Sequence, residues 1–145
     1  MPILSEDADV RKLLSDATTI AVVGLSPDPS RDSHVIGAFL QRLGYRILPV
    51  NPMISTVLGE RSWPDLARLP GPPDIVNIFR RPEHVPALVE EAISIGARAI
   101  WMQLGVGDAA AAQRASDAGL AVVIDRCILV EHRRLLPAAR TPDRS

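Results

Sequence analysis

The stretch that decides the fold is Thr19-Ile20-Ala21-Val22-Val23-Gly24, a continuous apolar run that is rich in β-branched residues and ends in glycine. Such a run is typical of a strand that is buried on both faces of a parallel sheet. Apolar residues then recur at helical spacing from Val35 to Leu43 and stop at Gly44, and Ile47-Leu48-Pro49-Val50 forms the next apolar run. Together these segments predict a strand-helix-strand unit of the usual length.

The same alternation continues on both sides of this unit. Residues 10–17 carry apolar side chains at the spacing of an amphipathic helix. The chain beyond the unit predicts strands at 74–79, 99–102 and 121–124 and helices at 85–93, 109–118 and 130–136. Five strands that alternate with helices in this way predict an α/β fold, namely a Rossmann-like doubly wound five-stranded parallel sheet with helices on both faces.

The least regular part of the chain is the segment 52–73, which holds five prolines. It is predicted to be a loop with a short helix near residues 65–68. The pattern as a whole predicts one domain over residues 1–136 and a flexible C-terminal tail over residues 137–145.

Composition excludes several classes of protein. The 145 residues are 47% hydrophobic and 23% charged, with a formal net charge of −1, so the chain can bury a core and has no broad basic field. We therefore expect no nucleic-acid partner and no attraction to an anionic membrane. No apolar run approaches the roughly 20 residues that span a bilayer, and the N-terminus lacks the pattern of a signal peptide. These features lead us to expect a cytoplasmic protein.

A ligand of such a sheet binds outside the carboxyl ends of its strands. The segment after the first strand, residues 24–33, leads into a helix N-terminus, where free N–H groups and the helix dipole favour a phosphate. Ser26 and Ser33 can add hydroxyl donors, and Arg31 can add a positive charge. The segment matches neither the G-x-G-x-x-G fingerprint nor the phosphate loop of ATPases, and the alternative interpretation is a plain turn that needs Gly24 for its geometry.

The end of the second strand argues against an NAD site, which needs an acidic residue there to bind the ribose hydroxyls. No acidic residue occurs from Ser33 to Gly59, and the strand ends in Val50-Asn51-Pro52. Asn51 can bind a base or ribose, although Asn-Pro is also an ordinary turn signal. Arg80 and Arg81 follow the third strand, where a second phosphate is within reach.

Catalytic signals are weak. His34, His84 and His132 have no spacing that predicts a metal site or a nucleophile with its base. Cys127 lies beside Arg126, and a nearby positive charge favours a reactive thiolate, but lone cysteines mostly serve packing. We therefore predict no catalytic and no metal-binding residue.

Five motifs together resemble a known family, the small bacterial and archaeal coenzyme A-binding proteins, which are similar to the nucleotide-binding domain of the succinyl-CoA synthetase α subunit. The resemblance covers nearly the whole chain. Its motifs are Thr19-Ile20-Ala21-Val22-Val23-Gly24-Leu25-Ser26, Gly44-Tyr45-Arg46-Ile47-Leu48-Pro49-Val50-Asn51-Pro52, Asp74-Ile75-Val76 with Phe79-Arg80, Trp101-Met102-Gln103-Leu104-Gly105, and Val123-Ile124-Asp125-Arg126-Cys127.

The resemblance implies that the chain binds coenzyme A (CoA) or an acyl-CoA. CoA carries a phosphate on its ribose, which a carboxylate at the second strand end would repel. The ligase's phosphorylated histidine lies on a further domain that has no counterpart here, so the resemblance implies binding without catalysis. The implied CoA-binding residues are Gly24, Leu25, Ser26, Arg31, Ser33, Val50, Asn51, Pro52, Phe79, Arg80 and Gln103.

Three alternatives remain at this point. The first is a small enzyme that depends on NAD(P) or another nucleotide, which would need the missing acidic residue. The second is a module in which CoA regulates binding to an unknown protein partner, or a homodimer with Arg126, Glu131 and the last helix at its interface. The third is redox sensing through a mixed disulfide between Cys127 and the CoA thiol.

Overall fold

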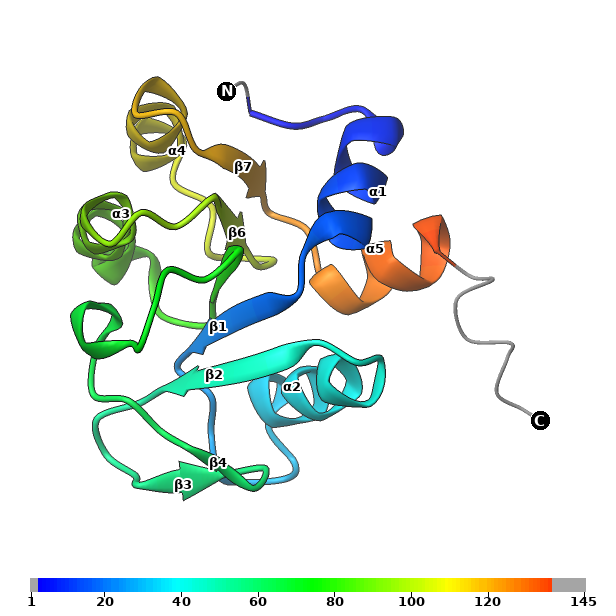
Figure 1. The fold of residues 1–145 in the computed structure, drawn as a ribbon. Helices are drawn as coiled ribbons and strands as arrows, with labels where there is room; N and C mark the ends of the chain where they lie inside the picture. The colour runs from blue at the N-terminus through cyan, green and yellow to red at the C-terminus, as the bar shows by residue number, and fades with distance from the viewer. Residues whose placement is uncertain (1–2, 137–145) are drawn as a thin grey trace.

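The computed structural model describes residues 3–136, in which strands and helices alternate (Figure 1). The elements are, in chain order, α1 (Asp7–Asp16), β1 (Thr19–Val23), α2 (Asp32–Arg42), β2 (Arg46–Val50), β3 (Thr56–Val57), β4 (Glu60–Arg61), the 3₁₀ helix η1 (Leu66–Arg68), β5 (Ile75–Ile78), the 3₁₀ helix η2 (Pro82–His84), α3 (Val85–Ser94), β6 (Ala99–Met102), α4 (Ala109–Asp117), β7 (Ala121–Ile124) and α5 (Ile128–Leu135).

The main sheet has five parallel strands in the order β2-β1-β5-β6-β7, which confirms the predicted fold class. Helices α3 and α4 cover one face, and α1, α2 and α5 cover the other (Figure 1). The chain runs outward from β1 to β2 and then returns past β1 to start β5. The strand order therefore reverses between β1 and β5, where doubly wound sheets open a crevice at the carboxyl ends of their strands.

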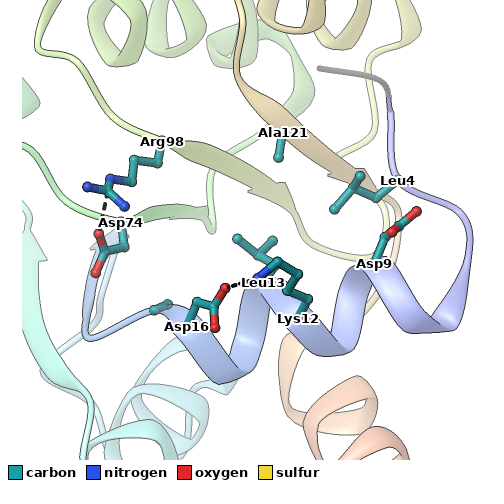
Figure 2. Close-up of a pocket in the computed structure, with 9 residues that line it drawn as sticks. Leu4, Asp9, Lys12, Leu13, Asp16, Asp74, Arg98 and Ala121 are labelled. Atoms are coloured by element: carbon teal, nitrogen blue, oxygen red, sulfur yellow. Dashed lines mark hydrogen bonds and ion pairs between the residues drawn. The ribbon is translucent and has the colours of Figure 1, made fainter.

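At the amino ends of the strands, opposite the crevice, a hollow of about 370 Å³ lies between α1 and the start of β5, β6 and β7 (Figure 2). Its floor is apolar, and four of its charged side chains are already paired with one another. Lys12 contacts Asp16 at 2.8 Å, and Arg98 lies 3.7 Å from Asp74. Asp74 also accepts hydrogen bonds from the backbone N–H groups of Thr18 and Thr19 at 2.8 and 3.1 Å. The charges at this edge therefore stabilise the fold and offer little to an ionic ligand.

Asp74 makes stability depend on pH. Partial burial raises the pKa of its carboxyl, but the hydrogen bonds from Thr18 and Thr19 lower it more, so the pKa lies below its ordinary value. We expect Asp74→Asn to lower the free energy of unfolding by about 1–2 kcal/mol at neutral pH. The deficit should shrink as the pH falls through the folded-state pKa, because the wild-type carboxylate then takes up a proton and loses its advantage.

Urea unfolding of both proteins over a pH series measures this deficit. Asp16→Asn, which removes only an exposed ion pair, serves as the control and should change stability by less than about 0.5 kcal/mol at any pH. A deficit for Asp74→Asn that stays constant into acid would contradict the assignment of the stabilisation to the charged form.

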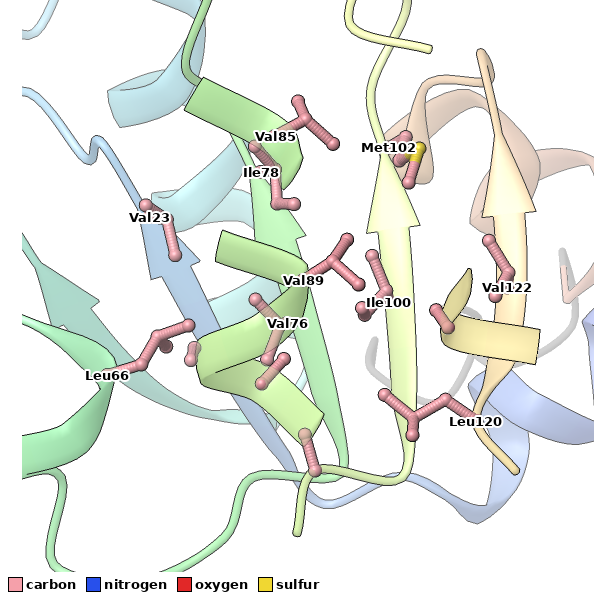
Figure 3. Packing of buried hydrophobic residues seen from close by; sticks show 14 of the residues in the cluster. Val23, Leu66, Val76, Ile78, Val85, Val89, Ile100, Met102, Leu120 and Val122 are labelled. Atoms are coloured by element: carbon pink, nitrogen blue, oxygen red, sulfur yellow. The ribbon is translucent and has the colours of Figure 1, made fainter. Parts of the chain in front are cut away.

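The buried side chains of the strands alternate between two cores. Val76 and Ile78 of β5 face α3, where they pack with Val85 and Val89 (Figure 3). Ile75 belongs to the second core, beneath α1, α2 and α5. The strand interiors are thus apolar on both faces, which explains why they appear in the sequence as continuous apolar runs and not as alternating ones.

Both outer strands of the sheet are covered by short irregular segments. Trp63 bridges to β2, where its N–H donates to the Pro49 carbonyl and its carbonyl accepts from the Asn51 N–H, each at 2.9 Å. Leu4 donates its N–H to the carbonyl of Val122 in β7 at 2.7 Å, beside a bridge from Ile3. Neither edge strand therefore presents a continuous row of free backbone groups to solvent.

The structure corrects two details of the prediction. The segment 52–73 is more ordered than a loop, because β3 and β4 form an antiparallel hairpin, and the predicted short helix is the 3₁₀ helix η1. The last helix begins at Ile128 and not near Val130. The predicted flexible tail, residues 137–145, lies outside the described residues.

Candidate ligand-binding cleft

A cleft of about 740 Å³ opens at the carboxyl edge of the sheet, where the strand order reverses. Four segments line it: residues 24, 26, 30–33 and 36 between β1 and the first turns of α2, residues 79–82 after β5, residues 103–106 after β6, and residue 127 before α5. The N-termini of several helices therefore surround one space, as expected for an anion site in a doubly wound sheet.

The floor of the cleft depends on Gly24. Its backbone has a φ of +87°, and a Cβ at this position would lie 2.3 Å from the carbonyl oxygen of Phe79. The same Cβ would lie 3.1 Å from Cδ of Arg80, so the Arg80 side chain passes directly over the glycine. Only a residue without a side chain allows the ends of β1 and β5 to approach this closely.

The loop after β1 is held by short polar contacts that leave its hydroxyl protons free. Oγ of Ser33 accepts from the Ser26 N–H at 2.9 Å, and Oγ of Ser26 accepts from the Asp28 N–H at 3.1 Å. His34 donates from Nδ1 to the Ser26 carbonyl at 2.9 Å, since a carbonyl only accepts. Each serine keeps its own O–H as a donor, and these donors lie at the N-terminus of α2.

Three arginines and one aspartate set the charge of the cleft. Within residues 3–136, Arg31 and Arg80 form no ion pair, and Arg81 has only a long contact of 3.9 Å with Glu83. The aspartate is Asp32, in the first turn of α2. The cleft therefore holds more positive than negative charge, although Arg31 also acts on the nearby carboxylate of Asp28 and helps to lower its pKa.

Gln103 extends this site on the side of β6. Its side chain is 5% exposed, and its Oε1 accepts from Nδ2 of Asn77 and from the N–H of Ile128, each at 3.0 Å. Both lone pairs of Oε1 are thus used, which fixes the orientation of the amide. Nε2 has no partner among the described residues. Oδ1 of the fully buried Asn77 is likewise unpartnered.

Seven of the eleven predicted CoA-binding residues line the cleft, and four do not: Leu25, Val50, Asn51 and Pro52. The Leu25 side chain is buried in the core. Asn51 uses its amide internally, because Nδ2 donates to the Leu25 carbonyl at 3.0 Å and Oδ1 accepts from the Met53 N–H at 2.9 Å. Its amide ties the loop after β1 to the loop after β2. Ligand contact remains a prediction for all eleven residues.

The cleft also includes residues outside the list of implied CoA-binding residues. Arg81 and Cys127 had been considered for a second phosphate and for a ligand thiol, and Leu104 lies just after a strand end, so their positions carried a usable signal. Ile36 and Val106 are ordinary apolar residues in the sequence, and nothing there marks them as cleft residues. The half-buried Cys127 borders the cleft, and its reactivity with a ligand thiol stays a prediction.

The structure offers no metal centre in its described part, where no three histidine, cysteine, aspartate or glutamate side chains gather. Among the same residues, no helix has the length and apolar character needed to cross a membrane.

A family model described as a CoA binding domain matches residues 18–133, which is more than half of the chain. The chain is also 41% identical over 125 residues to the protein YneT of Bacillus subtilis, a match that covers 86% of this chain and 93% of that protein. Both comparisons include the loop after β1, the end of β5 and the end of β6.

Solved structures share the fold. A protein from Pyrococcus horikoshii superposes with a TM-score of 0.88 at 36% identity, over 94% of this chain and 97% of that one. The dinucleotide-forming acetyl-coenzyme A synthetase 1 of Ca. Korarchaeum cryptofilum, in complex with phosphate and ADP, superposes with a TM-score of 0.69 at 23% identity. That match covers 77% of this chain and 26% of the synthetase, and it concerns the fold alone.

Proposed function

The chain belongs to the CoA-binding domain family, and from that premise we propose that it binds coenzyme A or an acyl-CoA in the cleft at the carboxyl edge of the sheet, without transforming it chemically. The observation that carries the proposal is the pair Arg31 and Arg80, two guanidinium groups that share one cleft and form no ion pair within residues 3–136. An unpaired arginine is well suited to bidentate contact with a phosphate.

The neighbourhood of these arginines fits a pyrophosphate in particular. The O–H groups of Ser26 and Ser33 are free to donate, and the N-terminus of α2 adds its dipole. Gly24 lets the ends of β1 and β5 come together, which places the Arg80 side chain over the start of the loop after β1. Hydrogen bonds and charge therefore favour the same ligand group at the same place.

The end of β2 supports CoA over NAD. The residue that follows β2 is Asn51, where an NAD site requires a carboxylate for the ribose hydroxyls. CoA instead carries a phosphate on its ribose, and a carboxylate at this point would repel it. The acid that does line the cleft, Asp32, belongs to α2 and lies on the side of Arg31.

Binding without catalysis is supported by what the polar side chains in and beside the cleft already do. His34 uses Nδ1 to hold the carbonyl of Ser26. Oε1 of Gln103 is shared between Asn77 and the start of α5. These groups hold the site together, and none of them forms a nucleophile-base pair with Cys127 among the described contacts.

Calorimetric titration of the purified protein with CoA, NAD, NADP and ATP tests the proposal. We expect saturable binding of CoA with one site per chain, and an affinity that falls about 10- to 100-fold in Arg80→Ala, because a charge-assisted contact to phosphate is lost. Ser26→Ala should lower the affinity less. Arg68→Ala removes an arginine from η1, outside the cleft, and should leave the affinity for CoA unchanged.

Each outcome separates the alternatives. Binding of NAD without binding of CoA would favour the dehydrogenase interpretation, and no heat with any of the four ligands would remove the ligand-binding proposal. Equal losses in Arg80→Ala and Arg68→Ala would place the ligand somewhere other than this cleft.

A further inference from the structure

A second hollow of about 320 Å³ adjoins the cleft, between the turn after β6 and the start of α5. The two spaces share the lining residues Leu104 and Cys127. The two spaces are therefore neighbours, separated by no more than these two residues. The hollow is not needed for the phosphates or the nucleotide, whose charged partners all lie in the cleft.

The wall of this hollow exposes apolar side chains. Leu104 is 63% exposed and Val130 is 52% exposed, and they are two of only four large hydrophobic residues that are exposed within residues 3–136. Isolated exposed leucines and valines are common on protein surfaces. Two of them facing one hollow beside a ligand cleft instead provide an apolar surface that a ligand can cover.

Four of the five charged residues that line the hollow are paired with one another, and the fifth, Asp125, accepts a hydrogen bond from the N–H of Gly105 at 2.7 Å. Arg134 lies 2.8 Å from Asp7 and 2.7 Å from Glu131, and Arg126 lies 3.3 Å from Glu131. Two arginines and two acids therefore form a closed network that joins α1 to α5. The network occupies both arginines, and Asp125 adds a further carboxylate, so the hollow disfavours an anionic group and favours an uncharged one in a CoA ligand.

The cleft holds a side chain with an unpartnered hydrogen-bond donor, next in sequence to one of the residues that the two spaces share. Gln103 precedes Leu104 in the sequence, and its Oε1 accepts from the N–H of Ile128, which follows Cys127. Because Oε1 is fully used by Ile128 and Asn77, the unpartnered group of this side chain is the Nε2 donor. A donor that is buried except at a ligand cleft favours an acceptor such as a carbonyl oxygen.

We propose that the preferred ligand is a short-chain acyl-CoA, with the apolar acyl chain in the hollow between Leu104 and Val130 and with the thioester carbonyl accepting a hydrogen bond from Nε2 of Gln103. This inference rests on the proposed function, because it places the remainder of a ligand whose phosphates occupy the cleft. The arrangement joins a donor for the carbonyl to an apolar surface for the chain that follows it.

Titration with CoA, acetyl-CoA and butyryl-CoA tests the inference. Butyryl-CoA should bind about tenfold tighter than CoA, since each buried methylene adds a favourable contribution, and acetyl-CoA should lie between them. Val130→Glu should abolish the advantage of butyryl-CoA over CoA, and because the added charge acts on the phosphates of both ligands, the ratio of the two affinities is the quantity compared. Val35→Glu introduces the same charge at a comparably exposed valine of α2 that does not line the hollow, and should keep the advantage.

A second variant isolates the donor. Gln103→Glu keeps an acceptor for Asn77 and Ile128 but replaces the Nε2 donor with an oxygen. Its added charge weakens the binding of both ligands through their phosphates, so the informative quantity is the ratio of the two affinities. We expect the preference for butyryl-CoA over CoA to fall in this variant, and a preference that survives would overturn the role of Gln103.

The outcomes distinguish this inference from the proposed function. If CoA binds and butyryl-CoA binds no tighter, the acyl site is wrong while CoA binding stands. If butyryl-CoA binds tighter and Val130→Glu keeps the advantage, the acyl chain lies elsewhere and the inference is overturned. If neither ligand binds, the proposed function fails and this inference fails with it.

Discussion

Gly24→Ala is expected to lower the free energy of unfolding by about 3 kcal/mol or more and to abolish ligand binding. Two costs combine at this position. A φ of +87° is unfavourable for any residue with a Cβ, and that Cβ would lie 2.3 Å from the Phe79 carbonyl oxygen. Because the clashing Phe79 oxygen belongs to the backbone, the clash can be removed only if the ends of β1 and β5 separate. This movement displaces Arg80.

Urea unfolding with a parallel titration of CoA measures both effects. Gly44→Ala is the matched control, because Gly44 has a φ of +106° but no heavy atom within 4 Å of the added Cβ. It should cost only about 1 kcal/mol and leave binding intact. Equal costs in the two variants would show that backbone conformation alone accounts for the effect, and that the close approach of β1 to β5 contributes nothing.

Asn77→Asp is expected to destabilise the protein by about 3 kcal/mol or more at neutral pH. The side chain is fully buried in the centre of the sheet, and its Nδ2 donates to Oε1 of Gln103. An aspartate would place a charged carboxylate oxygen against Oε1 of Gln103, so that two acceptors face each other. The other oxygen of the aspartate would take the place of Oδ1 of Asn77, which already has no partner. Rotation of the Gln103 amide would satisfy the aspartate, but it would deprive the N–H of Ile128 of its acceptor.

The near-isosteric variant Asn77→Leu provides the contrast. It removes the donor to Gln103 but also removes the unpartnered oxygen, so we expect a change of no more than about 1 kcal/mol. Burial raises the pKa of the introduced aspartate, so Asn77→Asp should recover relative to the wild type as the pH falls and the carboxyl becomes neutral. Thermal or urea unfolding at several pH values measures this recovery. A larger loss in Asn77→Leu than in Asn77→Asp would contradict this account.

The sheet could be predicted from the sequence because its strands are buried on both faces. Apolar runs such as 19–24 and 99–102 leave few structural alternatives once glycines and helical repeats separate them. The position of the cleft followed from the same alternation, since the loops after β1 and β5 meet at the reversal of strand order. Gly24, Arg31 and Arg80 could therefore be placed at this cleft without knowledge of the structure, and their contact with a ligand stays a prediction.

The β3–β4 hairpin could not be predicted in the same way. Its two-residue turn is Leu58-Gly59, with φ values of 55° and 75°. Sequences usually mark such a turn with Asn-Gly or Asp-Gly, because leucine adopts a positive φ at a cost. The strands have two residues each, which is too short for a periodic pattern to emerge.

The hydrogen bonds of individual side chains could not be predicted from the sequence either. The sequence showed that Asn51 follows β2, but it did not show that backbone groups of Leu25 and Met53 occupy both ends of its amide. In the same way, Gln103 was selected for its place after β6, whereas its fixed orientation depends on Asn77, which lies 26 positions earlier. Such pairings arise from strand register, which the local sequence does not encode.

The covering of the two sheet edges also bears on aggregation. Exposed edge strands recruit strands from other molecules, and proteins suppress this with prolines and with covering segments. In β2, the Pro49 carbonyl bonds to Trp63 on the outer side, where proline lacks an N–H that another strand could use. In β7, the segment Ile3-Leu4 covers Val122. The few residues ahead of α1 therefore help to keep the folded chain from adding strands of its neighbours.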